Sequence, residues 1–156
     1  ELELNYKTIK DRFDIFRKKI ALFLENEYNH SIKDYNEYEE FYYIKEREKK
    51  KKKKSLSESI NIMGFYSNKK VYTLLMPKIG RRAFDIEDGF IQYLNWNKIH
   101  SLNSHQTNLN IFWKFLEDNL KKYKGFEEDN FFYYLKESEF KFNYTKDEQI
   151  EILRNL

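Results

Sequence analysis

The chain has 156 residues, enough for one domain with a hydrophobic core, and its 40% hydrophobic and 19% aromatic content excludes disorder by composition. A net charge of +3 does not by itself argue for nucleic acid, and the lack of cysteine excludes disulfides and thiol nucleophiles. No apolar run or signal-peptide pattern predicts a membrane span or secretion, so we expect a nuclear or cytoplasmic protein. The sequence begins with Glu1 rather than Met, which is consistent with a fragment of a longer protein.

Residues 5 to 26 are expected to form a helix. Asn5 can cap its N-terminus, and apolar side chains follow at helical spacing, namely Ile9, Phe13, Phe16, Ile20, Phe23 and Leu24. Basic residues, Lys7 and Lys10 among them, occupy much of the remaining surface. Two interpretations are open: an amphipathic core helix with a solvated basic face, or the second helix of a helix-turn-helix whose first helix would precede Glu1.

Three antiparallel strands are expected next. They are YEEFYYI (38–44), SINIMGFY (59–66) and VYTLLMP (71–77), and the polar turn SNKK joins the last two into a hairpin that Pro77 ends. An unbroken lysine run connects the first two strands. Such a run cannot pack, so it predicts a solvated loop made of Lys49, Lys50, Lys51, Lys52, Lys53 and Lys54.

Residues 78–108 are polar and irregular, and helical patterns follow them. A helix is expected to open at Thr107 or Asn108 and to end at Gly125, with an inward face of Leu109, Phe112, Trp113, Leu116 and Leu120. A second helix is expected over about 128–138, with Phe131, Tyr134 and Leu135 inward, and a short third one over 147–156. Strands and helices together predict a mixed α/β (α+β) domain.

Short motifs in a fixed order suggest an origin for this domain. After NEYEEFYY (36–43) and the lysine run come IMGF (62–65), DGFIQYL (88–94), HQTNLNIFW (105–113) and YLKESEFKFN (134–143). From residue 36 to residue 143 this series resembles the signatures of DDE-type transposases of the bacterial insertion-sequence kind, whose eukaryotic branch is called Merlin. The last block is the most specific, with Lys141 where the family usually has Arg.

The resemblance implies an RNase H-like catalytic domain over residues 31–156, after a helical remnant of a helix-turn-helix region over residues 1–30. It places Glu39 at the first catalytic Asp, Asp88 at the second and Asn110 at the third acidic position. In the family these groups hold two divalent cations, Mg²⁺ above all, that cut DNA and join strands. It also implies that double-stranded DNA is the partner, with the lysine run, Lys7 and Lys10 as contacts, and it leaves room for a homo-oligomer.

Each catalytic position departs from the family or is weakened. Glu39 is one methylene longer than Asp, Asn110 carries no charge, and Glu117 stands where relatives with that Asn have Lys. Only ten residues (78–87) precede Asp88, where the family places a helix and a fourth strand, so the core or the gene model has lost an element. We therefore expect a transposase-derived, DNA-binding protein whose ancestral cleavage activity is lost.

Other interpretations of the same residues remain open. Glu39 and Glu40 suit the solvent-facing positions of an edge strand, Asp88 suits a turn before Gly89, and the lysine run suits a solvated loop without any contact to phosphates. The whole chain then fits either a retained DNA-binding protein without catalysis or an adaptor whose aromatic surface binds another protein.

Overall fold

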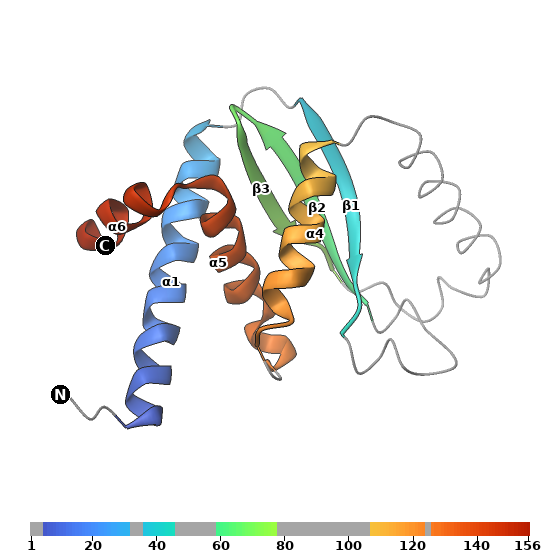
Figure 1. Ribbon diagram of the computed structural model, residues 1–156. Coiled ribbons are helices and arrows are strands. Elements are labelled where there is room, and N and C mark those ends of the chain that lie inside the picture. Colours follow the sequence, from blue (N-terminus) through green and yellow to red (C-terminus); the bar gives the residue numbers. More distant parts are fainter. Residues whose placement is uncertain (1–4, 32–35, 46–58, 78–106, 124–125) are drawn as a thin grey trace, which may run out of the picture.

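The structure is a computed structural model that describes residues 5–31, 36–45, 59–77, 107–123 and 126–156 (Figure 1). Its elements, in chain order, are α1 (Tyr6–Ser31), β1 (Glu37–Tyr43), β2 (Ile60–Ser67), β3 (Lys70–Leu75), α4 (Asn108–Leu120), the 3₁₀ turn η3 (Glu128–Asn130), α5 (Phe131–Asn143) and α6 (Lys146–Asn155). The mixed α+β class predicted from the sequence is confirmed, and each expected strand and helix is present.

The sheet is antiparallel, with the strand order β1-β2-β3. A two-residue turn joins β2 to β3, and both of its residues, Asn68 and Lys69, have left-handed backbone angles (φ 50° and 63°). Such turns match the twist of the flanking strands, so they suit tight hairpins. In the register of the sheet, Glu39 of β1 lies opposite Gly64 of β2, which lies opposite Thr73 of β3.

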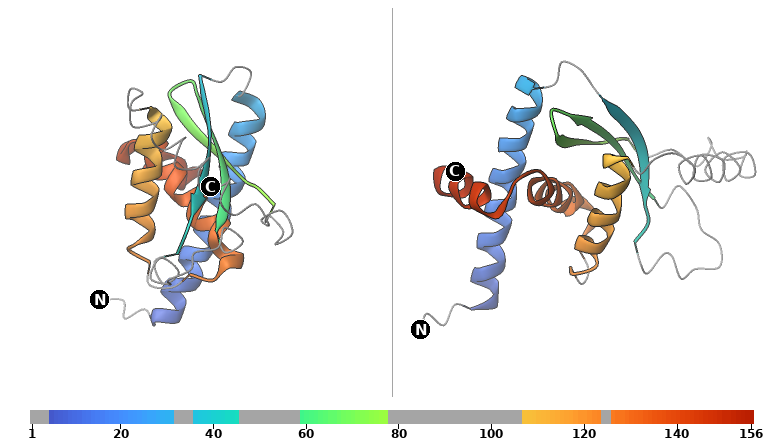
Figure 2. Two further views of the ribbon diagram at one scale, coloured as in Figure 1. Left: turned by 90° about the vertical axis from the view of Figure 1, so that its right-hand side faces the viewer. Right: turned by 45° about the horizontal axis from the view of Figure 1, so that its top comes forward.

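The main core lies between the sheet and the pair α4 and α5. Helix α4 lies across one face of the sheet, and α5 runs beside β3 (Figures 1 and 2). The apolar spacing that predicted α4 also predicted its buried face correctly. Its core residues, which meet Ile62 and Val71 of the sheet and Phe131 and Leu135 of α5, are Leu109, Phe112, Trp113, Leu116 and Leu120.

A second, smaller core joins α1, α5 and α6. Ile20 and Leu24 of α1 are buried against Phe140 and Tyr144, and apolar residues of α6 close the cluster. Helix α6 begins with a capping box in which Thr145 and Glu148 satisfy each other's backbone N–H groups. Helix α1 therefore shares a core with α5 and α6. The domain boundary predicted near residue 30 stays a prediction.

The two halves of α1 differ in their surroundings. Asn5 accepts a hydrogen bond from the Lys7 N–H and caps the helix as expected. The apolar face of the helix is buried only from Ile20 onward, whereas Ile9, Phe13 and Phe16 on the same face are exposed. Figures 1 and 2 show the first turns of α1 standing clear of the other helices. Among the described helices, none is both long and apolar enough to cross a bilayer.

Candidate functional site

Two of the three predicted catalytic positions lie on elements that pack against each other, β1 and α4. Glu39 lies in the middle of β1, and Asn110 lies in the first turn of α4, the helix that lies across this sheet. Asp88 and the lysine run Lys49–Lys54 lie outside the described residues. The two remaining predicted DNA contacts, Lys7 and Lys10, are exposed at the start of α1.

Glu39 is held by Trp113 of α4. The indole Nε1–H donates to Glu39 Oε2 over 3.1 Å, and the Glu39 side chain is half-buried. Burial raises the pKa of Glu39, the hydrogen bond from Trp113 opposes that rise, and the charge of Glu37 adds to it. Glu39 is thus not a solvent-facing residue, whereas Glu40, on the opposite face of the strand, is exposed.

The Trp113 ring lies on the sheet over Gly64. It stacks on Phe41 with ring centroids 4.7 Å apart and an interplanar angle of 5°. A Cβ atom on Gly64 would lie 2.5 Å and 2.6 Å from Cζ2 and Cη2 of this ring, closer than any real carbon contact. Only glycine therefore leaves room for the tryptophan at this point of β2.

Glu37 fixes the start of α4. Its Oε1 accepts a hydrogen bond from Asn108 Nδ2 over 2.8 Å, and its Oε2 accepts one from the Leu109 N–H over 3.2 Å. A carboxylate at a helix N-terminus satisfies free N–H groups and favours the helix dipole. Glu37 carries no motif that points to this role, although its spacing of two residues along the strand places it on the same face as Glu39.

Among the described groups at this junction of β1 and α4, hydrogen bonds already engage carboxylate oxygens that a cation would need. Both Glu37 oxygens accept hydrogen bonds from α4, one Glu39 oxygen accepts from Trp113, and Asn110 is neutral. These N–H donors compete with Mg²⁺, which binds carboxylate oxygens, for the same lone pairs. Over the residues that the structure describes, no group of three His, Cys, Asp or Glu side chains is placed to hold a metal ion.

Helix α5 covers the outer edge of β3 with side chains. Asn143 accepts from the Val71 N–H (2.7 Å) and donates to the Val71 carbonyl (2.6 Å), as a neighbouring strand would. Two residues along, Glu139 accepts from the Thr73 N–H over 3.0 Å and Lys136 donates to the Thr73 carbonyl over 2.8 Å. These groups satisfy the edge of the sheet and block its pairing with another chain.

Lys136 and Glu139 form a buried ion pair as they do so. Their Nζ and Oε2 atoms lie 3.0 Å apart, and both side chains are almost completely buried. Burial raises the pKa of Glu139, and the charge of Lys136 and the hydrogen bonds from Thr73 oppose that rise. Both residues belong to the most specific motif of the sequence, but their burial was not predicted there, because charged residues are rarely buried.

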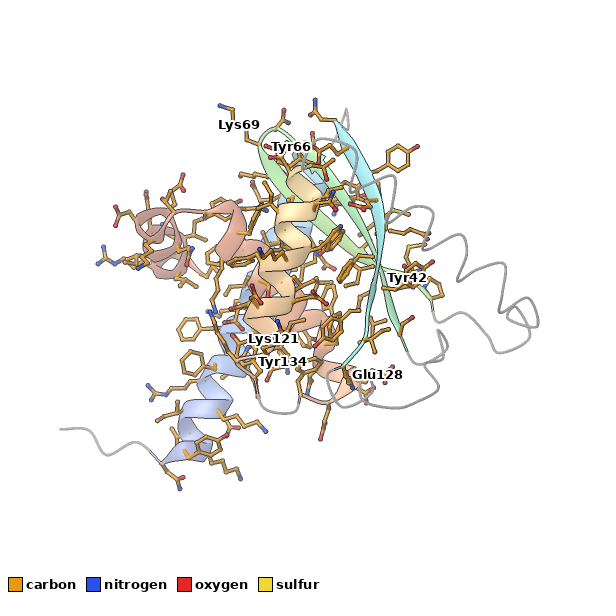
Figure 3. The ribbon with its side chains drawn as sticks, turned by 45° about the vertical axis from the view of Figure 1, so that its right-hand side comes forward. Tyr42, Tyr66, Lys69, Lys121, Glu128 and Tyr134 are labelled. Atoms are coloured by element: carbon orange, nitrogen blue, oxygen red, sulfur yellow. The ribbon has the colours of Figure 1, made fainter. Side chains whose placement is uncertain are left out.

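A second charged cluster in the same block ties α1 to α5. Arg17 Nε donates to Glu137 Oε2 over 2.7 Å, and Lys141 Nζ donates to Glu137 Oε1 over 2.6 Å. The Arg17 guanidinium also lies 4.3 Å from the centroid of the Tyr134 ring. Figure 3 labels Tyr134 close to Lys121, the residue that follows α4. Lys141 thus bonds an acidic neighbour one turn away on its own helix, Glu137.

Compared with known proteins, the chain matches no family model, no curated protein and no solved structure.

Proposed function

We propose that this chain derives from a DDE-type transposase with an RNase H-like catalytic domain, and that it now binds duplex DNA without cutting it. One observation carries the proposal. Glu39, Gly64 and Trp113 belong to three separate motifs of the resemblance, and they meet at one point between β1, β2 and α4. Their convergence is what three motifs of one ancestral catalytic core would give, and it supports that origin.

The last motif supports the same origin. Within YLKESEFKFN, Asn143 bonds the edge of β3, and Glu137 and Lys141 bond each other and Arg17. Its apolar members also pack, since Leu135 and Phe140 lie in the two cores. The motif therefore packs α5 against the sheet. This structural role does not depend on catalysis, so it can be kept after catalytic activity is lost.

The chemistry of the junction supports the loss of catalysis. A longer side chain at residue 39, a hydrogen-bonded carboxylate and a neutral Asn110 each weaken cation binding, and a misplacement of about 1 Å can cost roughly a hundredfold in rate. We expect no nicking of supercoiled plasmid with Mg²⁺ or Mn²⁺. Nicking by the unaltered chain that disappears on Asp88→Ala would show that the enzyme is active, and a contaminating nuclease would not respond to that change.

DNA binding is measured with a fluorescent duplex over a range of salt concentrations. Contacts to about four to six phosphates should give a log–log slope of about −4 to −5, and glutamine at Lys49–Lys54 should flatten it. Glutamine at Lys7 and Lys10 should reduce the slope by about 2. The same change at Lys114 and Lys122, which are exposed on and just after α4, serves as the matched control and should leave the slope unchanged. Absence of binding at about 50 mM salt, or an unchanged slope in both test variants, would refute DNA binding.

A further inference from the structure

The exposed half of α1 presents an apolar seam. Tyr6, Ile9, Phe13 and Phe16 recur at alternating spacings of three and four residues, and all four side chains are exposed. The same spacing continues into Ile20, which is buried in the contact with α5 and α6. The seam is therefore the continuation, into solvent, of a face that already packs against another helix of this chain.

The seam is narrow and has basic residues on both sides. With Tyr6 and Phe13 at position a of a heptad and Ile9 and Phe16 at position d, the flanking positions e and g hold Lys10 and Arg12. Both of these side chains are exposed. One heptad further, the same flanking positions hold Lys19 and Arg17, and the Arg17 guanidinium is already paired with Glu137. The one acidic residue beside the seam, Asp14, is paired with Arg17 at 2.9 Å.

We propose that residues 6–16 of α1 dock an amphipathic helix of a partner protein, with an apolar stripe between rows of Asp and Glu. A seam confined to positions a and d suits a helix, whereas a membrane surface suits a wider apolar face. A second copy of this chain would set basic flanks against basic flanks in either orientation, which is unfavourable. Duplex DNA would match the lysines but would leave Phe13 and Phe16 without apolar partners.

The docking site spans about three helical turns, or about 16 Å at 1.5 Å per residue. A partner of this length contributes few anchors, so an affinity in the micromolar range is expected, carried mainly by contacts to the two phenylalanines. The site goes beyond DNA binding, since neither Phe13 nor Phe16 is a phosphate contact.

The test uses the full chain and a synthetic helical peptide of about three heptads, with Leu at a and d and Glu at e and g. Phe13→Glu should weaken binding at least about tenfold, because it removes an apolar anchor and opposes the acidic flanks. Ile15→Glu is the matched control. Ile15 is as exposed as Phe13 (55% and 54%) and lies on the other side of the same helix, so this variant should bind like the unaltered chain.

Charge reversal gives an independent readout. The double variant Lys10→Glu and Arg12→Glu should lose about tenfold in affinity for the Glu-flanked peptide and should gain affinity for a peptide with Lys at e and g. Both positions are solvent-exposed, so the variants should fold, and circular dichroism checks that they do. A variant with glutamine at Lys49–Lys54 should keep peptide binding, which separates this proposal from DNA binding.

Each of four results would overturn the proposal. The first is that the Glu-flanked peptide does not bind at about 100 μM. The second is that the unaltered chain binds the Lys-flanked peptide as tightly as the Glu-flanked one. The third is a Phe13-dependent dimer in sedimentation, which would make a second copy the occupant. The fourth is loss of affinity for anionic vesicles or for duplex DNA on Phe13→Glu but not on Ile15→Glu, which would assign the seam to that surface instead.

Discussion

Replacing Gly64 with alanine tests the junction of β1, β2 and α4 directly. The new methyl would lie 2.5 Å and 2.6 Å from two ring carbons of Trp113 and 3.1 Å from Cδ2 of Leu109. Carbon atoms prefer separations of about 3.5–4.0 Å, so the ring must move by about 1 Å. Trp113 is only 4% exposed, stacks on Phe41 and donates to Glu39, so it cannot move without loss of these contacts.

The expected cost follows from these contacts. Overpacking of a filled core costs about 1–3 kcal/mol, while Gly→Ala alone returns about 0.4–1 kcal/mol by restricting the unfolded chain. We therefore expect Gly64→Ala to lower the free energy of unfolding by about 1–2 kcal/mol. In a chain of this size the melting temperature should fall by roughly 2–8 °C. Urea denaturation followed by circular dichroism should show a lower midpoint with an unchanged slope.

A double-mutant cycle with Trp113→Phe supplies the control. Phenylalanine lacks the outer ring carbons that meet the Gly64 methyl, so Gly64→Ala should cost less than about 0.5 kcal/mol in that background. A neutral or stabilising Gly64→Ala in the unaltered chain would refute this account. So would an equal cost in both backgrounds, because the strain would then not come from Trp113.

Two further predictions concern the charged groups of α5. Glu139→Gln and Lys136→Met should each lower the free energy of unfolding by about 3–5 kcal/mol, since each leaves a buried charge without its partner. In urea titrations the double variant should lose less stability than the sum of the two single losses. Burial would raise the pKa of Glu137, but hydrogen bonds from Lys141 and Arg17 outweigh it and hold that pKa below its usual 4.5. A depressed pKa contributes stability above pH 4.5 that is lost as the pH falls, so the difference in stability between the unaltered chain and Glu137→Gln should be largest near neutral pH and shrink in acid. A pH-independent difference would contradict that account.

Local pattern was sufficient for most of the elements, and for a physical reason. The spacing of Leu109, Phe112 and Leu116 predicts both a helix and its buried side, because a helix against a sheet must bury one stripe. The hairpin of β2 and β3 was likewise predictable from a short polar turn between two apolar runs. These features depend on residues close together in the sequence.

Features that depend on distant partners were not predictable in this way. Lys136 and Glu139 are charged, which indicates a surface position, yet they are buried because their partners are the backbone groups of Thr73 on an edge strand. The same limit applies to α1. Periodicity showed that Phe13 and Ile20 share a face, but only the packing of α5 and α6 decides that Ile20 is covered and Phe13 is not.

On the proposed ancestry, the junction at Glu39 has exchanged cations for hydrogen-bond donors. A half-buried carboxylate is costly unless something compensates its charge, and in an active enzyme of this kind the cations do so. Here the indole of Trp113 bonds Glu39, and the N-terminal turn of α4 bonds Glu37. These donors need no metal, so selection could act on the packing of β1 against α4 after catalysis had gone. What remained for function would then include the basic and apolar sides of α1, which lie away from the sheet.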